Sequence, residues 1–176
     1  MCGIAGVLLH RRDSVAATVM RDRGRAMADI LYHRGPDGFG VWTDASTALV
    51  HTRLAIIDTS AAGNQPMHDE TGRFHLIFNG EIYNYKVLRR ELVDKGYRFF
   101  GQSDTEVILN GYREWGTGIF SRLSGMFAIA IWDSAEQRMV LARDRFGEKP
   151  LYYYNSIDSL VFASEIKAIL TWPDVP

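Results

Sequence analysis

Cys2 is the only thiol in the sequence, and it directly follows Met1. A cysteine acts as a nucleophile when a neighbouring base takes its proton. Methionine before a small residue is commonly trimmed, and the exposed α-amino group of Cys2 would have a pKa of about 7.7 to 8.0, which suits this base. The position therefore predicts an N-terminal nucleophile. Two other interpretations stay open: a small buried apolar residue at the start of a strand, and acylation as a lipid anchor, for which the sequence offers no polybasic context.

The histidines offer no metal site. None of them has a metal-binding spacing such as His-x-x-x-His, and the single cysteine supplies no soft ligand. We therefore expect no metal in this domain. The five histidines are His10, His33, His51, His68 and His75.

The composition predicts one globular domain. The chain has 176 residues, of which 47% are hydrophobic and 23% are charged. A formal net charge of -1 leaves no basic excess for a nucleic-acid or membrane partner, and no run of about 18 apolar residues could cross a bilayer. The charges at Arg11 and Arg12 follow the short N-terminal apolar run, unlike those of a signal peptide. Because a lone thiol favours a reducing compartment, we expect a cytoplasmic protein.

Three segments have helical patterns. Apolar residues recur at helical spacing through residues 14–32. A second helix is expected over residues 84–95, between an asparagine cap and a glycine stop. The sequence Ser103-Asp-Thr-Glu106 fits a capping box, which predicts a third helix from there to about Trp115.

The remaining apolar runs predict strands. In residues 126–132, Phe127, Ile129 and Ile131 share one face, and Ala128 and Ala130 lie on the other, where another layer must approach closely. One sheet packed on another would satisfy this pattern, so the sequence predicts a layered α+β fold. The expected strands are 48–57, 74–78, 126–132, 139–142, 151–154 and 160–163.

Six short motifs follow one another along the chain: Met1-Cys-Gly-Ile-Ala-Gly6, His33-Arg-Gly-Pro-Asp-Gly38, His51-Thr-Arg-Leu-Ala-Ile-Ile-Asp58, Asn79-Gly-Glu-Ile-Tyr-Asn84, Ser103-Asp-Thr-Glu106 and Ala142-Arg-Asp-Arg-Phe-Gly147. Together they resemble the class II glutamine amidotransferases, and the asparagine synthetase B family in particular. The resemblance implies the fold of the N-terminal-nucleophile hydrolases, a four-layer αββα sandwich. It also implies a glutaminase domain over residues 2–170, with residues 171–176 beginning a linker.

The resemblance makes Cys2 the nucleophile that attacks the side-chain amide of glutamine, forms a glutamyl thioester and releases ammonia. It assigns the side-chain amide of Asn79 and the backbone N–H of Gly80 to the oxyanion hole, where the tetrahedral intermediate needs preorganised donors. Asparagine followed by glycine at the end of a strand is also an ordinary turn, and this alternative stays open.

A free amino acid carries a carboxylate and an ammonium group, so its pocket should offer a planar cation and a carboxylate. The resemblance gives these roles to Arg53 and Asp104. Alternatively, Arg53 is a solvated residue at a strand edge, and Asp104 stabilises only the first turn of its helix. The resemblance also implies that Glu81 and the backbone after Arg53 line the glutamine pocket. The residues concerned in that segment are Leu54, Ile56 and Ile57.

The remaining motifs are expected to have structural roles. Residues 33–38 form either a loop next to glutamine or a turn in which Arg34 and Asp37 pair on the surface. Residues 143–147 and 149–154 are expected to build the sheets and the face toward a following domain.

No phosphate-binding loop occurs in the sequence, so we expect no cofactor in this domain. The resemblance implies that ATP and magnesium belong to an absent C-terminal synthetase domain or subunit, which would use the ammonia to make asparagine from aspartate. The 176 residues would then be an excised domain or a free-standing subunit, and either could form a homodimer. The alternatives are another class II amidotransferase with a different acceptor, and a non-catalytic amino-acid-binding domain of the same fold.

Overall fold

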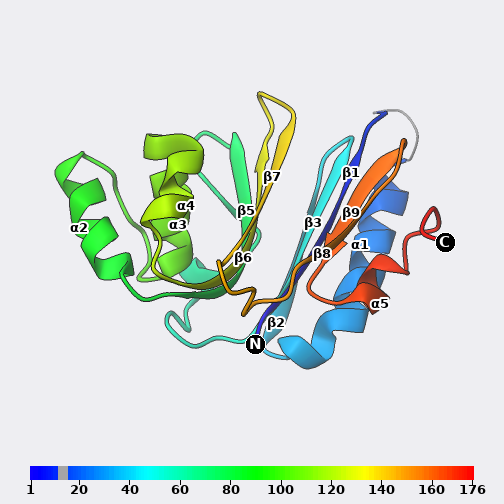
Figure 1. Ribbon diagram of the computed structural model, residues 1–176, viewed down its shortest axis with the longest axis horizontal. Helices are drawn as coiled ribbons and strands as arrows, with labels where there is room; N and C mark the ends of the chain where they lie inside the picture. The colour runs from blue at the N-terminus through cyan, green and yellow to red at the C-terminus, as the bar shows by residue number, and fades with distance from the viewer. Residues whose placement is uncertain (12–15) are drawn as a thin grey trace.

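The chain forms four layers, in which two antiparallel β-sheets pack face to face and helices cover both outer sides (Figure 1). The computed structural model describes residues 1–11 and 16–176. Helices and strands are mixed along the chain, and both sheets are built from antiparallel pairs. The predicted α+β class and the αββα order of layers are confirmed.

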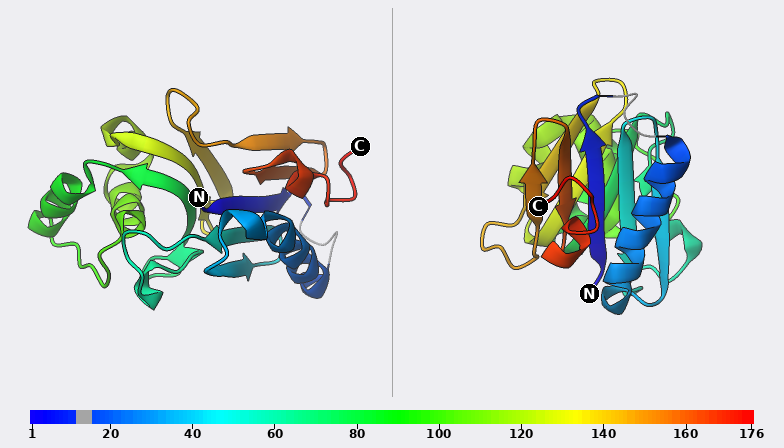
Figure 2. Two further views of the ribbon diagram at one scale, coloured as in Figure 1. Left: turned by 90° about the horizontal axis from the view of Figure 1, so that it is seen from below. Right: turned by 90° about the vertical axis from the view of Figure 1, so that its right-hand side faces the viewer.

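The first sheet has the strand order β2-β3-β1-β9-β8. Its strands are β1 (Gly3–Leu9), β2 (Gly38–Thr43), β3 (Thr47–Arg53), β8 (Tyr152–Asn155) and β9 (Ser159–Ala163). Strand β1 lies in the middle of this sheet, between β3 and β9, as the right-hand view of Figure 2 shows. Cys2, the residue before β1, is therefore attached to a strand that is paired on both sides.

The second sheet has the order β4-β5-β6-β7. Its strands are β4 (Met67–His68), β5 (Phe74–Ile82), β6 (Gly125–Asp133) and β7 (Arg138–Arg143). Strands β5 and β6 pair over nine residues, and this register places Asn79 opposite Ala128 and Gly80 opposite Phe127. The long ladder makes β5 a rigid support for the residues near its end.

Helices α1 (Ala17–Leu31) and α5 (Ile166–Ile169) cover the first sheet, and α2 (Tyr85–Asp94), α3 (Asp104–Trp115) and α4 (Ile119–Arg122) lie on the outer side of the second sheet (Figure 1). Short 3-10 helices occupy Tyr32–Arg34, Ala61–Gly63 and Gly116–Gly118. Helix α1 begins later than predicted, and residues 14 and 15 of that prediction lie outside the described residues. In the described part of the chain, no helix has the length and apolar character that crossing a membrane requires.

The apolar core has three parts, one under the helices of each sheet and one between the sheets. The alternation predicted for β6 is confirmed, since Phe127, Ile129 and Ile131 pack under the helices of the second sheet, while Ala128 and Ala130 face the other sheet. The core between the sheets contains Ile4, Leu49, Ile77, Ala128, Ala130, Trp132 and Phe162. Because two alanines stand where larger residues would separate the layers, the sheets approach closely at this point.

The strand predicted over residues 48–57 is wrong beyond Arg53, where β3 ends. Residues 54–57 lie outside the sheet, and side chains rather than a neighbouring strand bind the backbone of Leu54 and Ala55. The sulfur of Cys2 accepts a hydrogen bond from the Leu54 N–H at 3.3 Å, and a carboxylate oxygen of Asp37 accepts one from the Ala55 N–H at 2.9 Å. Ile56 is 72% exposed, so this apolar run borders a pocket and does not enter the core.

The capping box at α3 is half formed. Ser103 accepts a hydrogen bond from the Glu106 N–H at 3.3 Å, as predicted. The carboxylate of Glu106 does not return to Ser103. It accepts hydrogen bonds from the N–H groups of Phe100 and Gly101 at 2.7 and 2.9 Å. Glu106 therefore fixes the loop that leads into α3, and with it the start of the helix.

The helix α2 begins after Asn84 as predicted, but this residue makes no side-chain cap. Its amide instead donates to the Arg122 carbonyl at 2.9 Å and accepts from the Ser124 N–H at 3.0 Å. The predicted glycine stop is confirmed, because Gly96 has a left-handed φ of 92°.

The close approach of the sheets gives a first prediction. Ala130→Leu adds three carbons between packed layers, so we expect the free energy of unfolding to fall by about 1 to 3 kcal/mol. Urea denaturation measures this change. The matched control is Ala135→Leu, at an exposed position. Equal stability of the two variants would contradict the packing described for the two sheets.

Candidate active site

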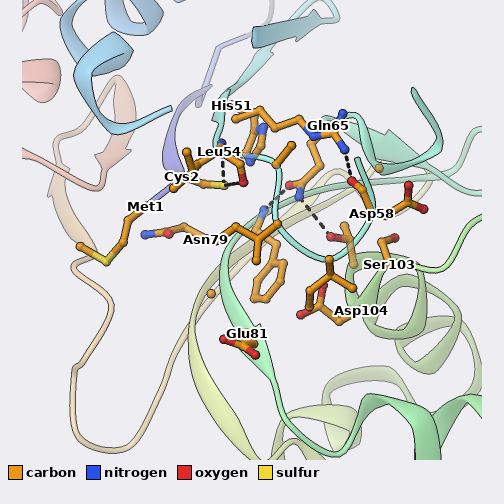
Figure 3. Close-up of a pocket in the computed structure, with 18 of the residues that line it drawn as sticks. Met1, Cys2, His51, Leu54, Asp58, Gln65, Asn79, Glu81, Ser103 and Asp104 are labelled. Carbon is orange, nitrogen blue, oxygen red and sulfur yellow. Dashed lines mark hydrogen bonds between the residues drawn. The ribbon is translucent and has the colours of Figure 1, made fainter. Parts of the chain in front are cut away.

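One pocket lies where the ends of β1, β3 and β5 meet the start of α3, with a volume of about 170 Å³ (Figure 3). Figure 3 shows Cys2 on one side of this pocket and Ser103 and Asp104 on the other. Every residue predicted to transform or bind the substrate contributes to the lining. These residues are Cys2, Arg53, Leu54, Ile56, Ile57, Asn79, Gly80, Glu81 and Asp104. The fold thus brings together residues from the whole length of the chain, while their chemical roles stay predictions.

Cys2 is half-buried at the pocket wall. Its sulfur lies 3.3 Å from the backbone nitrogen of Leu54 and 3.5 Å from the carbonyl oxygen of the same residue. The N–H of Leu54 can donate to a thiolate, while the carbonyl accepts from the thiol form. The interpretation of Cys2 as a merely buried apolar residue does not account for these polar contacts.

Arg34 connects the main chain of Cys2 to the C-terminal part of the domain. Its Nε donates to the Cys2 carbonyl at 3.0 Å, and its Nη1 donates to the Glu165 carboxylate at 2.9 Å. Burial raises the pKa of Glu165, but hydrogen bonds from Arg34 and His33 outweigh it and lower this pKa to about 2. The proposed surface pair of Arg34 with Asp37 is therefore wrong. The motif at residues 33–38 holds the N-terminus in place.

Asn79 lies inside β5 and is 1% exposed, and its Nδ2 has no hydrogen-bond partner among the described residues. An unpaired buried amide costs about 1 to 3 kcal/mol, so a group that enters the pocket is needed to satisfy it. Gly80 follows in the same strand, where a Cβ would lie 2.2 Å from the Met126 carbonyl oxygen. The alternative of an Asn-Gly turn is wrong, because β5 continues to Ile82.

Arg53 stands at the end of β3 with its guanidinium in the pocket lining. Its Nη1 donates to Asn64 Oδ1 at 2.6 Å, and its Nη2 donates to the carbonyl of Asp58. Gly63 makes room for this group, since a Cβ there would lie 2.5 Å from Nη2. These bonds exclude a freely solvated side chain. Both acceptors are neutral, so neither hydrogen bond neutralises the positive charge of the guanidinium.

Asp104 lies in the first turn of α3 and is 5% exposed. One of its carboxylate oxygens accepts a hydrogen bond from the Ile82 N–H at 3.0 Å. Burial raises the pKa of Asp104 to about 6, with a small contribution from the negative charge of Glu81, although hydrogen bonds from backbone N–H groups act in the opposite direction. A cation beside such a buried carboxylate stabilises its charged form, so the side chain can bind an ammonium group.

His51 and Lys149 are among the pocket residues that were not predicted as functional. His51 faces the space between the sheets, is 1% exposed, and has no hydrogen-bond partner on either ring nitrogen among the described residues. Burial lowers the pKa of His51 to about 3, so its ring is neutral. Lys149 is 6% exposed and lies in a segment that was expected to be structural. A single histidine or lysine carries no sequence signal of burial, because the sheets that cover it come from distant parts of the chain.

The arrangement supports acyl transfer to a cysteine. A sulfur nucleophile, an unpaired amide donor and a pair of opposite charges suit a small zwitterion with a reactive carbonyl group. In residues 1–11 and 16–176 no group of three or more His, Cys, Asp or Glu side chains could hold a metal ion.

The fold defines the class of protein. Glutamine phosphoribosylpyrophosphate amidotransferase from Bacillus subtilis, solved with ADP and GMP, superposes with a TM-score of 0.77 over 97% of this chain and 43% of that one, at 25% identity. Two packed antiparallel sheets with Cys2 at the start of a central strand make this an N-terminal-nucleophile fold of the class II amidotransferase type.

The model of the glutamine amidotransferase domain family matches residues 1–176, and the chain belongs to this family. Asparagine synthetase [glutamine-hydrolyzing] 3 of Bacillus subtilis is 41% identical over 99% of this chain and 28% of its own length. Asparagine synthetase B [glutamine-hydrolyzing] of Escherichia coli is 39% identical over 97% of this chain and 30% of its own. Amidase chry2 of Gibberella zeae is 38% identical over 98% of this chain and 27% of its own length. The chain thus spans less than a third of each of these relatives.

The raised pKa of Asp104 gives a second prediction. Asp104→Asn keeps an acceptor for the Ile82 N–H but removes the buried charge. Between about pH 4 and 6 the carboxyl of Asp104 is protonated in the folded wild type, whereas in the unfolded chain, with a pKa near 3.8, it is ionised. The stability that the protonated carboxyl gives is present below about pH 4 and is lost as the pH rises through about 6. We therefore expect the variant to be more stable than wild type above pH 7, by about 1 to 3 kcal/mol, and the difference to disappear near pH 4.

Urea denaturation at several pH values between 4 and 8 measures this difference. Asp94→Asn, an exposed position on α2, is the matched control and should show no such trend. A difference between Asp104→Asn and wild type that is the same at every pH would contradict the account of the buried carboxyl.

Proposed function

We propose that this domain hydrolyses glutamine to glutamate and ammonia through a thioester on Cys2. The observation that carries the proposal is that the sulfur of Cys2 and the buried side-chain amide of Asn79, which has no partner among the described residues, line the same pocket. An amide donor without a partner is costly in a resting protein and useful to an oxyanion. The family match supports glutamine as the substrate.

The charges of the pocket support a defined orientation of glutamine. Arg53 binds the α-carboxylate, and Asp104, with Glu81 nearby, binds the α-ammonium. The backbone of residues 54–57 forms the adjoining wall. The side-chain amide then points toward Cys2, whose sulfur is fixed by the backbone of Leu54.

The reaction proceeds in two halves. With Met1 removed, the α-amine of Cys2 takes the thiol proton, and the thiolate attacks the amide carbon of glutamine. The oxyanion of the tetrahedral intermediate accepts hydrogen bonds from the Asn79 amide and the Gly80 N–H. The intermediate collapses as the α-ammonium returns its proton to the leaving nitrogen, which departs as ammonia. Water then attacks the thioester and releases glutamate.

For the complete protein we propose ammonia transfer to a C-terminal synthetase part that uses ATP and magnesium to make asparagine from aspartate. Residues 2–170 form the glutaminase domain and residues 171–176 begin the linker. The two synthetases named above support this acceptor. The similarity to a fungal amidase supports the second candidate, an amidotransferase with a different acceptor. The single thiol supports a cytoplasmic location.

Ammonia release from glutamine tests the proposal, with the N-terminus checked by intact mass. Cys2→Ala should abolish release, and Asn79→Ala should lower kcat by about 100-fold to 1,000-fold with little change in KM, because only the oxyanion loses its donor. Asn155→Ala, at an exposed position on β8, is the control and should leave both constants unchanged. Undiminished release by Cys2→Ala, or none by correctly trimmed wild type, would contradict the proposal and favour an amino-acid-binding domain.

A further inference from the structure

Lys149 is a buried cation whose surroundings change when the chain matures. Its Nζ lies 3.2 Å from the sulfur of Met1, and this thioether is its only hydrogen-bond partner among the described residues. No carboxylate of the described chain lies within 4.0 Å of it. A thioether is a weak acceptor and leaves a buried ammonium poorly compensated. Removal of Met1 takes away even this partner.

Hydrogen bonds from neighbouring residues fix the backbone of Lys149. It lies in the loop between β7 and β8, which crosses from one sheet to the other beside the N-terminus (Figure 1). The carboxylate of Asp144 accepts hydrogen bonds from four backbone N–H groups, including that of Lys149 at 3.0 Å. The guanidinium of Arg143 donates to the Lys149 carbonyl at 2.8 Å. With its backbone fixed at both the N–H and the carbonyl, the lysine is held against the pocket.

Lys149 contacts the residue that precedes Cys2, and Cys2 and Lys149 line the same pocket. Because the side chain of Met1 contacts Lys149 and Met1 is bonded to Cys2, removal of Met1 would free the α-amine of Cys2 next to the residue that Lys149 contacts. The other cationic or titratable nitrogen groups near Lys149 either bind other residues or are neutral. Arg34 binds the Cys2 carbonyl and Glu165, Arg53 binds Asn64 and Asp58, and His51 is neutral. The carboxylates Asp58, Glu81 and Asp104 also line the pocket.

We propose that Lys149 is a positioning residue for the chemistry of Cys2: its ammonium keeps the freed α-amine of Cys2 uncharged near neutral pH and stabilises the thiolate. The inference rests on the proposed function. A like charge nearby disfavours the protonated amine, whose ordinary pKa is about 7.7 to 8.0. The amine is then ready to take the thiol proton, and its ammonium form returns that proton readily to the leaving nitrogen. No co-reactant beyond glutamine and water is needed.

The test is the pH dependence of two reactions of the trimmed protein, glutamine hydrolysis and alkylation of Cys2 by iodoacetamide followed by mass spectrometry. Lys149→Met removes the charge in a side chain of similar length. We expect the acidic limb of kcat/KM and the midpoint of alkylation to move to higher pH by about one unit. Lys149→Arg keeps the charge and should keep both midpoints. Lys86→Met, an exposed lysine on α2, is the matched control.

The outcomes separate the inference from the proposed function. If wild type releases ammonia but Lys149→Met and Lys149→Arg have the midpoints of wild type, the inference is wrong and the glutaminase stands. A loss of activity in both variants, with unchanged alkylation midpoints, would also overturn the inference, since that pattern indicates a packing role only. If wild type releases no ammonia, the proposed function fails, while the alkylation midpoints still report the effect of Lys149 on Cys2.

Discussion

The whole site depends on the pairing of β1 with a strand on each side. Because β3 and β9 hydrogen-bond to its two edges, the first strand of the chain is a central strand of the sheet. Its N-terminal end therefore cannot fray in the manner usual for chain termini. Arg34 adds a bond to the carbonyl of Cys2 from outside the sheet. A residue at the very end of the chain thus gains the fixed position that a nucleophile needs.

The apolar layers stabilise the fold enough to tolerate buried polar groups without partners in the pocket. Asn79 and His51 are almost fully buried with unpaired nitrogens, and Lys149 has only a thioether beside it. A buried polar group without a partner costs free energy. Three apolar clusters on and between the sheets offset this cost, and strands β3 and β5 hold His51 and Asn79 in place. A substrate can supply partners to these buried polar groups. Where those partners form in the transition state, the interactions lower the barrier of the reaction.

Much of this could be predicted from the sequence, and the failures have physical causes. The alternation of large and small residues in β6 predicted the packing of two sheets, and the ordered motifs predicted the pocket lining. Strands β1 and β2 were not predicted, because Gly3, Gly6, Gly38 and Gly40 interrupt their apolar pattern. At Gly6 a Cβ would lie 2.4 Å from the ring of Phe162, a contact that no local pattern reveals. The burial of His51 and Lys149 likewise arises from strands that are distant in the sequence.

The central claim is that Cys2, with a free α-amine, forms a covalent bond to the glutamyl group. Rapid acid quenching of the protein with glutamine, followed by intact-mass and peptide analysis, measures this intermediate directly. We expect a glutamyl adduct on Cys2 in chains that have lost Met1, and none in chains that retain it. An adduct at another residue, or one that forms equally in chains with and without Met1, would contradict the account.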